Sequence, residues 1–230
     1  KSAAPLGGWK PKQVACWDCE KTHTLPLDVR QALASAEGFF SRHEGHTVNW
    51  FEQPGVAGLW TPNADVKDAY GASADYTISL ASLATSATLV AGQEGTAVSN
   101  TTNLFDNYIV QGKITTGTTP TVDKTIEVHL YGSTTDTPVY PDVLDGTDSA
   151  ETLTSVNVKK GALRLLDRLF VDATSDRAYP FGPVGIAQFF GWIVPKNHGL
   201  FVTHDTAVNL NATGTNHVLS YAGHFVTVIG

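Results

Sequence analysis

The sequence predicts a mainly β protein, an antiparallel β-sandwich or jelly-roll-like domain preceded by a small α-containing zinc-binding module. Charged residues make up only 16% of the chain, and 21 glycines accompany many threonines and valines. Such residues favour pleated strands and tight turns. From residue 76 onward, short runs of alternating apolar and polar residues are separated by turn residues. Both cysteines, Cys16 and Cys19, lie near the N-terminus and set that region apart.

These differences divide the chain into four parts. Residues 1–15 contain proline and glycine without apolar periodicity and predict an extended arm. Residues 16–53 hold the cysteines and one convincing helical pattern, which predicts the zinc-binding module. Residues 54–75 are a turn-rich connector that includes Trp60, and residues 76–230 form the predicted β-sandwich.

The zinc hypothesis rests on two close pairs of ligand residues. Cys16-x-x-Cys19 is followed by His43-x-x-His46, and zinc prefers four tetrahedral ligands from thiolates and imidazoles. A helix from an N-cap at Asp28 to near Gly45 would carry the histidines back over the cysteines. His23 is an alternative ligand. Four protein ligands leave no open position, so the zinc would be structural.

A C-x-x-C pair has other uses. It can be a redox couple, usually at the start of a helix after a strand, or a local disulfide. The surroundings of Cys16 and Cys19 lack that strand-to-helix pattern, which favours the metal site.

Predicted strands follow one another through the C-terminal part. The run 125–131 alternates most cleanly, with Ile126, Val128 and Leu130 on one face and Glu127 and His129 on the other. The remaining strands are expected at 76–80, 108–114, 163–171, 184–194, 199–204 and 217–229. Because no helices intervene, these strands favour a sandwich over a parallel α/β fold.

The segment 181–195 is apolar over its whole length. A central strand buried on both sides would explain it, and so would a subunit interface. Phe189, Phe190 and Trp192 offer more aromatic surface than a sandwich of this size must hold internally, so we expect part of it at a contact between copies.

Two further clusters could hold a ligand. Asp142, Asp145, Asp148 and Glu151 lie within ten residues around Gly146, and such oxygen ligands could bind calcium. Their spacing departs from the EF-hand pattern, and acidic loops often only bend and hydrate. His198, His204, His217 and His224 could form a second metal site or supply a base, but positions near strand ends are typical of structural histidines.

Several function classes are disfavoured. The formal net charge of -7 argues against a nucleic-acid partner, and no apolar stretch is long enough for a spanning helix. The nucleophile-elbow, zincin and P-loop motifs are missing, so we expect no enzyme. Asn100-Thr-Thr and Asn211-Ala-Thr match the glycosylation sequon, and we interpret both as polar turns.

Three runs resemble structural proteins of tailed bacteriophages. The runs are 104–120 leading into Ile126-Glu-Val-His-Leu-Tyr-Gly-Ser, the turn Val143-Leu-Asp-Gly-Thr-Asp-Ser, and 199–211 ending in Asn216-His-Val-Leu-Ser-Tyr. The N-terminal part is similar to small zinc-binding modules of phage proteins, with Cys16, Cys19, His43 and His46 at the ligand positions. The resemblance implies a β-sandwich in, or displayed on, the virion.

Two functions follow as expectations. The first is a capsid decoration or other structural subunit that binds neighbouring virion proteins and forms a homo-oligomer; the resemblance alone suggests a trimer. The second is a carbohydrate-binding module of a tail fibre or tail tip, for which Trp60, Tyr131 and Tyr140 could supply aromatic platforms. The location of the protein on the particle, head or tail, separates the two.

Overall fold

The computed structural model describes residues 12–16, 21–24, 48–52 and 65–229. The chain divides into two compact units, one of residues 1–66 with 228–230 and one of residues 67–227. The predicted helix between Asp28 and Gly45 lies outside the described residues. Among the helices that are described, none is both long and apolar enough to cross a membrane.

The N-terminal unit contains a three-stranded antiparallel sheet. Its strands are β1 (Lys12–Cys16), β2 (Lys21–Thr24) and β3 (Val48–Glu52), in the order β2-β1-β3. Cys16 ends β1 and pairs with Lys21 at the start of β2. The four-residue connection of this hairpin, residues 17–20, therefore contains Cys19.

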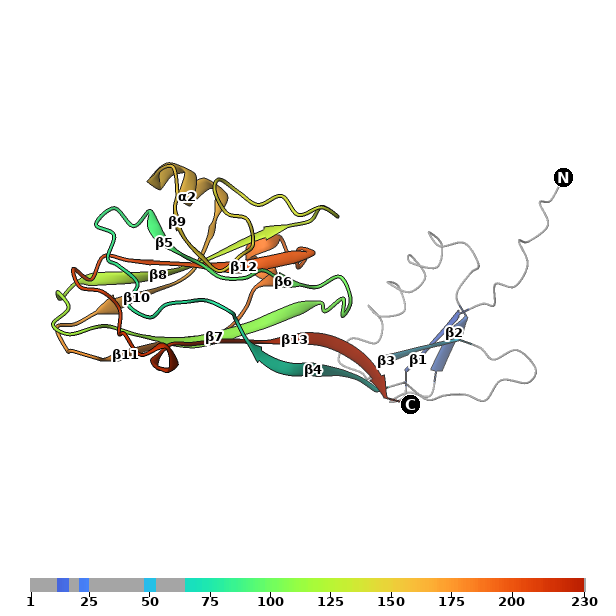
Figure 1. The fold of residues 1–230 in the computed structure, drawn as a ribbon. Coiled ribbons are helices and arrows are strands. Elements are labelled where there is room, and N and C mark those ends of the chain that lie inside the picture. The colour runs from blue at the N-terminus through green and yellow to red at the C-terminus, as the bar shows by residue number, and fades with distance from the viewer. Residues whose placement is uncertain (1–11, 17–20, 25–47, 53–64, 230) are drawn as a thin grey trace. The chain divides into compact units, whose positions relative to one another are not determined.

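The C-terminal unit is built from two antiparallel sheets, which Figure 1 shows as two layers. One sheet has the order β10-β8-β12-β5-β9, with β6 also paired to β12. Its strands are β5 (Ala91–Glu94), β6 (Val98–Ser99), β8 (Lys124–Ser133), β9 (Ser149–Thr152), β10 (Arg164–Val171) and β12 (Asn197–His204). The other sheet has the order β11-β7-β13-β4, from β4 (Asp65–Asp75), β7 (Asn107–Thr115), β11 (Ala178–Gly185) and β13 (Val218–Ile229).

The main core lies between the two sheets. Ile126, Val128 and Leu130 of β8 are fully buried in one cluster with Val110 and Ile114 of β7. The alternation of β8 predicted this apolar face, and the strands expected at 108–114, 125–131, 163–171, 199–204 and 217–229 are confirmed.

A second, smaller core lies on the other face of the six-stranded sheet. Tyr131 and Phe201, which alternate with the main-core residues Leu130 and Leu200, pack there with residues that precede β10. The helix α2 (Val156–Ala162) lies over this side (Figure 1). The expectation that no helix interrupts the strands is therefore wrong. Ser155 caps this helix by accepting a hydrogen bond from the backbone N–H of Val158 at 3.2 Å.

Two predicted strands are wrong. Tyr76 to Leu80 is irregular, and strand β4 instead occupies residues 65–75, part of the predicted connector. Tyr76 and Leu80 are buried as their alternation suggests. However, the backbone N–H of Tyr76 donates to Leu219, whereas that of Ser79 donates to the side chain of Asp148. The alternation of apolar and polar residues therefore predicted correctly which side chains are buried. It did not predict the backbone, because residues 76–80 form no continuous ladder of hydrogen bonds with a neighbouring strand.

The expected strand at 184–194 is replaced by other structure. Strand β11 ends at Gly185, and a 3₁₀ helix, η1 (Ala187–Phe190), follows. β11 lies at one end of its sheet, not at its centre, and contains Pro180 and Pro183 with a register shift between Phe181 and Val184. Proline cannot donate to a ladder, so it is confined to such positions.

Candidate interaction surface

Of the predicted zinc ligands, the structure describes Cys16 and the alternative ligand His23. Cys16 ends β1, and His23 lies in β2 opposite Val14. Cys19, His43 and His46 lie outside the described residues. Within the part of the chain that the structure describes, no cluster of three or more His, Cys, Asp or Glu residues suited to a metal is found.

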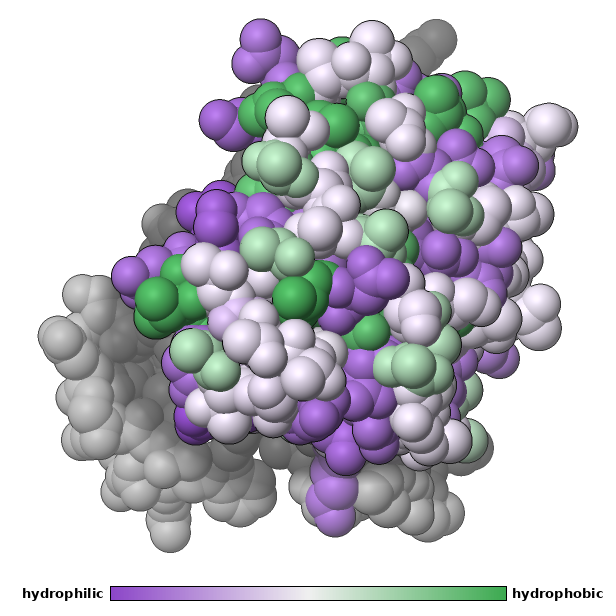
Figure 2. Space-filling view, turned by 60° about the vertical axis from the view of Figure 1, so that its left-hand side comes forward, coloured by the Kyte–Doolittle hydropathy of each residue, from purple (hydrophilic) through white to green (hydrophobic). Residues whose placement is uncertain are grey.

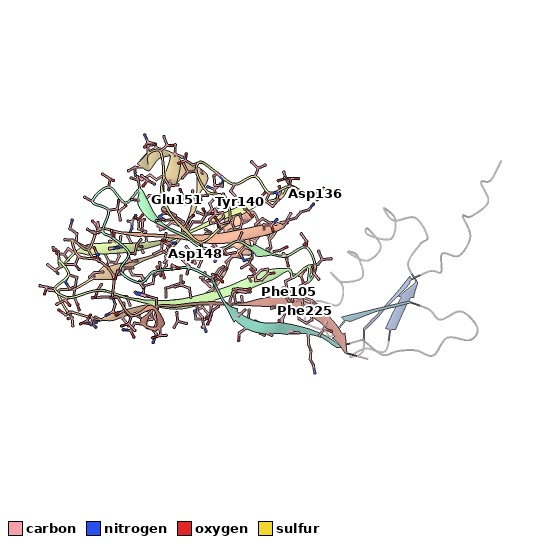
Figure 3. The ribbon with its side chains drawn as sticks, in the orientation of Figure 1. Phe105, Asp136, Tyr140, Asp148, Glu151 and Phe225 are labelled. Atoms are coloured by element: carbon pink, nitrogen blue, oxygen red, sulfur yellow. The ribbon has the colours of Figure 1, made fainter. Side chains whose placement is uncertain are left out.

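The carboxylates of the acidic segment 142–151 are used separately. Asp142 accepts from the backbone N–H and the hydroxyl of Thr154, both at 2.7 Å, and Asp145 accepts from Thr147. Asp148 and Glu151, labelled in Figure 3, likewise have their own partners, Gln93 Nε2 at 2.6 Å and Ser149 Oγ at 3.0 Å. These contacts bend and anchor the loop. The four carboxylates do not converge on a common position where they could coordinate calcium.

Glu94 of β5 anchors the same loop through hydrogen bonds to its backbone. Its buried carboxylate accepts from the backbone N–H of Asp145 at 3.1 Å and of Gly146 at 2.7 Å. Burial raises the pKa of Glu94, although these hydrogen bonds oppose the rise. Sequence reasoning missed this residue because its short strand β5 carries little apolar pattern.

The four C-terminal histidines are spread over the C-terminal unit. His204 contacts the hydroxyl of Thr206 and the carbonyl of Leu83, and His217 contacts the carbonyl of Asn211. His224 bonds to Asp68 at 3.1 Å, while His198 is fully buried in the core. These contacts are structural, and they do not bring the four imidazoles together.

A buried ionic cluster joins β8 to α2 and β10. The Glu127 carboxylate accepts from Lys159 Nζ at 2.6 Å, Arg168 Nη2 at 2.7 Å and His129 Nε2 at 3.0 Å. Burial alone would raise the pKa of Glu127, but the hydrogen bonds from His129 and Lys159, the Lys159 charge and Arg168 together hold it well below its usual range. Glu127, His129 and Lys159 are almost completely covered, so the cluster fastens the helix and offers no open site.

Of the aromatic residues expected to stack on a sugar, the structure describes Tyr131 and Tyr140. Tyr131 is 1% exposed, and its hydroxyl donates to the carbonyl of Gly95 at 2.7 Å. Tyr140 packs edge-on against Tyr131 with ring centroids 5.3 Å apart. Tyr131 is therefore excluded as an exposed sugar platform, and Trp60 lies outside the described residues.

The most conspicuous surface feature is an apolar projection after η1. Trp192 is 79% exposed and Ile193 is 73% exposed, whereas Phe189 and Phe190 pack partly buried against the main core. The apolar run 181–195 thus turns outward at its end. This outcome contradicts a central strand, whereas the subunit interface stays a prediction.

The backbone conformation that exposes Trp192 is strained. Gly191 and Trp192 both have positive φ angles, 74° and 69°. Glycine tolerates this region, but a bulky side chain there stores about 1–3 kcal/mol of strain. The Trp192 N–H donates to the carbonyl of Ala187 at 2.8 Å and closes the turn.

A groove of about 400 Å³ lies next to the projection. The groove is lined by the end of β8, by the residues that follow this strand and by the region around η1, namely Gly132, Ser133, Thr134, Thr135, Val139, Phe190, Ile193 and Pro195. Val139 is 70% exposed, and no sequence pattern predicts that it lies near Ile193. We call the exposed residues Val139, Trp192 and Ile193 the apolar surface.

Figure 2 shows how hydrophobic residues are distributed over one face of the molecule. On the face shown in Figure 2, hydrophobic residues stand singly or in small groups among hydrophilic and intermediate ones. Scattered exposed apolar residues are normal in soluble proteins, whereas clustered ones mark interaction sites. The apolar surface can therefore bind apolar side chains of another molecule.

Comparison of the chain with protein-family models gives no match. Comparison with curated proteins gives no match either. No solved structure matches the chain.

Proposed function

We propose that the chain is a non-enzymatic structural protein of a bacteriophage particle, of the capsid decoration type, whose C-terminal β-sandwich binds neighbouring virion subunits. Two antiparallel sheets with a shared core support the sandwich, or jelly-roll-like, assignment. The phage assignment rests on the sequence resemblance.

One observation carries the binding role. Trp192 and Ile193 are exposed to solvent at a turn in which Trp192 has a strained positive φ angle, and Ile193 lines a groove. Exposure of two large apolar side chains favours contact with a partner, because burying them recovers about 25 cal/mol per Å² of apolar area. The strained backbone at the exposed Trp192 also supports a binding role, because strain is often retained at functional sites.

A particle-binding assay tests this role. The double variant Trp192→Ser/Ile193→Ser is compared with Phe170→Ser, a matched control because Phe170 is a 72% exposed aromatic residue on β10. Wild type and the control should sediment with purified phage particles that lack the chain, and the double variant should not. Equal retention of all three would refute the role of the apolar surface, and no retention of wild type would refute the function.

We propose a homotrimer as the state in solution, on the resemblance alone. Closed rotational symmetry is the usual arrangement of identical subunits. Analytical ultracentrifugation should give three times the chain mass of 24.5 kDa, and a monomer at high concentration would contradict this proposal.

A tail-located glycan-binding module is the second candidate. Trp192 offers an exposed aromatic ring, and aromatic rings can stack on sugar faces. The groove that its neighbour Ile193 lines also contains the hydroxyl residues Ser133 and Thr135. Antibody labelling of particles in the electron microscope separates the candidates, since decoration proteins cover the capsid whereas receptor-binding modules sit on the tail.

We also propose that one structural zinc ion holds the N-terminal unit through Cys16, Cys19, His43 and His46. The four-residue connection that follows Cys16 is compatible with a C-x-x-C knuckle at the end of a hairpin.

A further inference from the structure

His198 lies at the contact between the two sheets. It belongs to β12 of the six-stranded sheet and is fully buried. Its ring centroid is 4.5 Å from that of Tyr108 on β7, in the four-stranded sheet, and 6.2 Å from that of Tyr76. Tyr221 of β13 packs behind both tyrosines. The imidazole therefore takes part in the packing of one layer on the other.

Neither ring nitrogen of His198 has a hydrogen-bond partner in the protein. The titratable groups that face it are tyrosines: Tyr108 of β7, Tyr76 after β4 and, behind them, Tyr221 of β13. Its neighbours along the sheet, Gly132 of β8 and Val98 of β6, carry no charge. A proton on this ring would place an uncompensated charge in an aromatic core, which is strongly unfavourable.

The other histidines that are buried or half-buried in the C-terminal unit have more hydrogen-bond partners, although Nδ1 of His129 has none. His129 contacts the Glu127 carboxylate, and His204 contacts a carbonyl and a hydroxyl. His217 accepts from the backbone N–H of Thr115 and contacts the carbonyl of Asn211. His198 thus has the least capacity to accommodate a charge.

Burial lowers the pKa of His198 to about 3, whereas an unfolded histidine titrates near 6.5. The unfolded state therefore binds one more proton than the folded state between these two pH values. Stability that is present at neutral pH is lost as the pH falls below about 6.5, by up to about tenfold in the unfolding equilibrium constant per pH unit.

We propose that His198 is an acid-sensitive element of the contact between the two sheets, so that uptake of one proton by this imidazole on acidification separates the layers. This device is independent of any partner, and its failure would leave the proposed function untouched. It would allow the C-terminal unit to loosen in mildly acidic surroundings while staying closed at neutral pH.

The test is the slope of stability against pH. Urea unfolding of the full chain is followed between pH 7.5 and 4.5 through the near-ultraviolet dichroism of tyrosine, since all seven tyrosines lie in the C-terminal unit. His198→Phe removes the titrating group and keeps a ring. Its slope should be smaller by one proton, so that acidification to pH 4.5 raises its unfolding constant about a hundredfold less than that of wild type.

Tyr76→Phe is the matched control, because it alters the same contact without removing a group that titrates in this range. Its slope should equal that of wild type. An unchanged slope in His198→Phe would overturn the proposal. If His198→Phe does not fold, histidine-selective nuclear magnetic resonance of the wild-type chain decides instead: one imidazole should stay neutral until the sheets unfold, and titration of every histidine near pH 6.5 in the folded protein would overturn the proposal.

Discussion

Phe105 lies across two glycines on neighbouring strands. A Cβ atom added at Gly223 of β13 would lie 2.1 Å from the Phe105 ring, and one added at Gly71 of β4 would lie 2.7 Å from it. The ring also contacts Tyr108 edge-on and lies near Phe225, as Figure 3 shows. The glycines thus allow an aromatic side chain to rest directly on the backbone of the sheet.

Gly223→Ala should lower the free energy of unfolding by about 1–3 kcal/mol, because the ring must move out of a packed position. Gly214→Ala is the control, since a Cβ there meets nothing within 4 Å, and we expect a change within about 0.5 kcal/mol. Urea unfolding measures both. Equal effects of the two substitutions would contradict the packing argument.

Asn100, part of a glycosylation sequon, is a buried structural residue. Its side-chain oxygen accepts from the Phe105 N–H at 2.8 Å and from the Tyr108 hydroxyl at 3.0 Å, and its amide donates to the Phe105 carbonyl at 3.0 Å. The interpretation as a turn agrees with these contacts, although the sequence did not show that the side chain itself closes the turn.

Asn100→Asp should destabilise the protein by about 1–3 kcal/mol, because it removes the amide donor and places a carboxylate next to a carbonyl. Asn103→Asp, at an exposed position of the same loop, should change stability little. The midpoints of thermal unfolding compare the two variants. A larger effect at residue 103 would show that the loop is fixed by other contacts.

At the level of elements, helix α2 depends on its anchor. Seven residues are too few for a helix that is stable by itself, and Lys159 is its only buried residue. The Lys159–Glu127 contact thus fixes the helix on β8. The helix lies over the side of the sheet that holds the second core.

Lys159→Met should cost about 3 kcal/mol, because it leaves Glu127 with fewer compensating charges in a buried place. Lys160→Met, the exposed neighbour, should be close to neutral. The effect should be largest above pH 4.5 and shrink as the pH falls, since protonation of Glu127 removes the charge that Lys159 compensates. Urea unfolding at pH 7 and at about pH 2.5 measures this difference, and an effect of equal size at both pH values would contradict it.

The strands that were predicted correctly share a feature. In β8 and β12 the alternation of side chains and the backbone ladder extend over the same residues, so a local pattern is sufficient. The segment 184–194 failed because its apolar residues serve two purposes: Phe189 and Phe190 enter the core, while Trp192 and Ile193 project outward. The Glu127 cluster and the position of Val139 arise from contacts between residues that are far apart in the sequence. The periodicity of a single segment cannot predict such contacts.

On the scale of the whole molecule, the two units can be followed separately. Four of the five tryptophans, Trp9, Trp17, Trp50 and Trp60, lie in the first 66 residues, whereas every tyrosine lies in residues 67–227. Tryptophan fluorescence therefore reports mainly on the N-terminal unit, and tyrosine dichroism reports on the C-terminal unit.

Protein purified without added metal should contain about one zinc per chain, as measured by elemental analysis. A strong chelator should change the tryptophan fluorescence and leave the tyrosine dichroism as it was, because the proposed ligands all lie in the N-terminal unit. Cys16→Ser should lower the zinc content in the same way, whereas His224→Gln, far from these ligands in the sequence, should not. A zinc content near zero in wild type, with freely reactive thiols, would refute the site.

The prolines of β11 also limit how copies of this protein can be joined. An incoming strand finds no donor at Pro180 or Pro183 and a register shift between Phe181 and Val184, so the four-stranded sheet cannot be extended from molecule to molecule on that side. Copies that meet there must do so through side chains alone. If copies of the protein contact one another at this edge, one copy could therefore leave without breaking a hydrogen-bonded sheet shared with its neighbours.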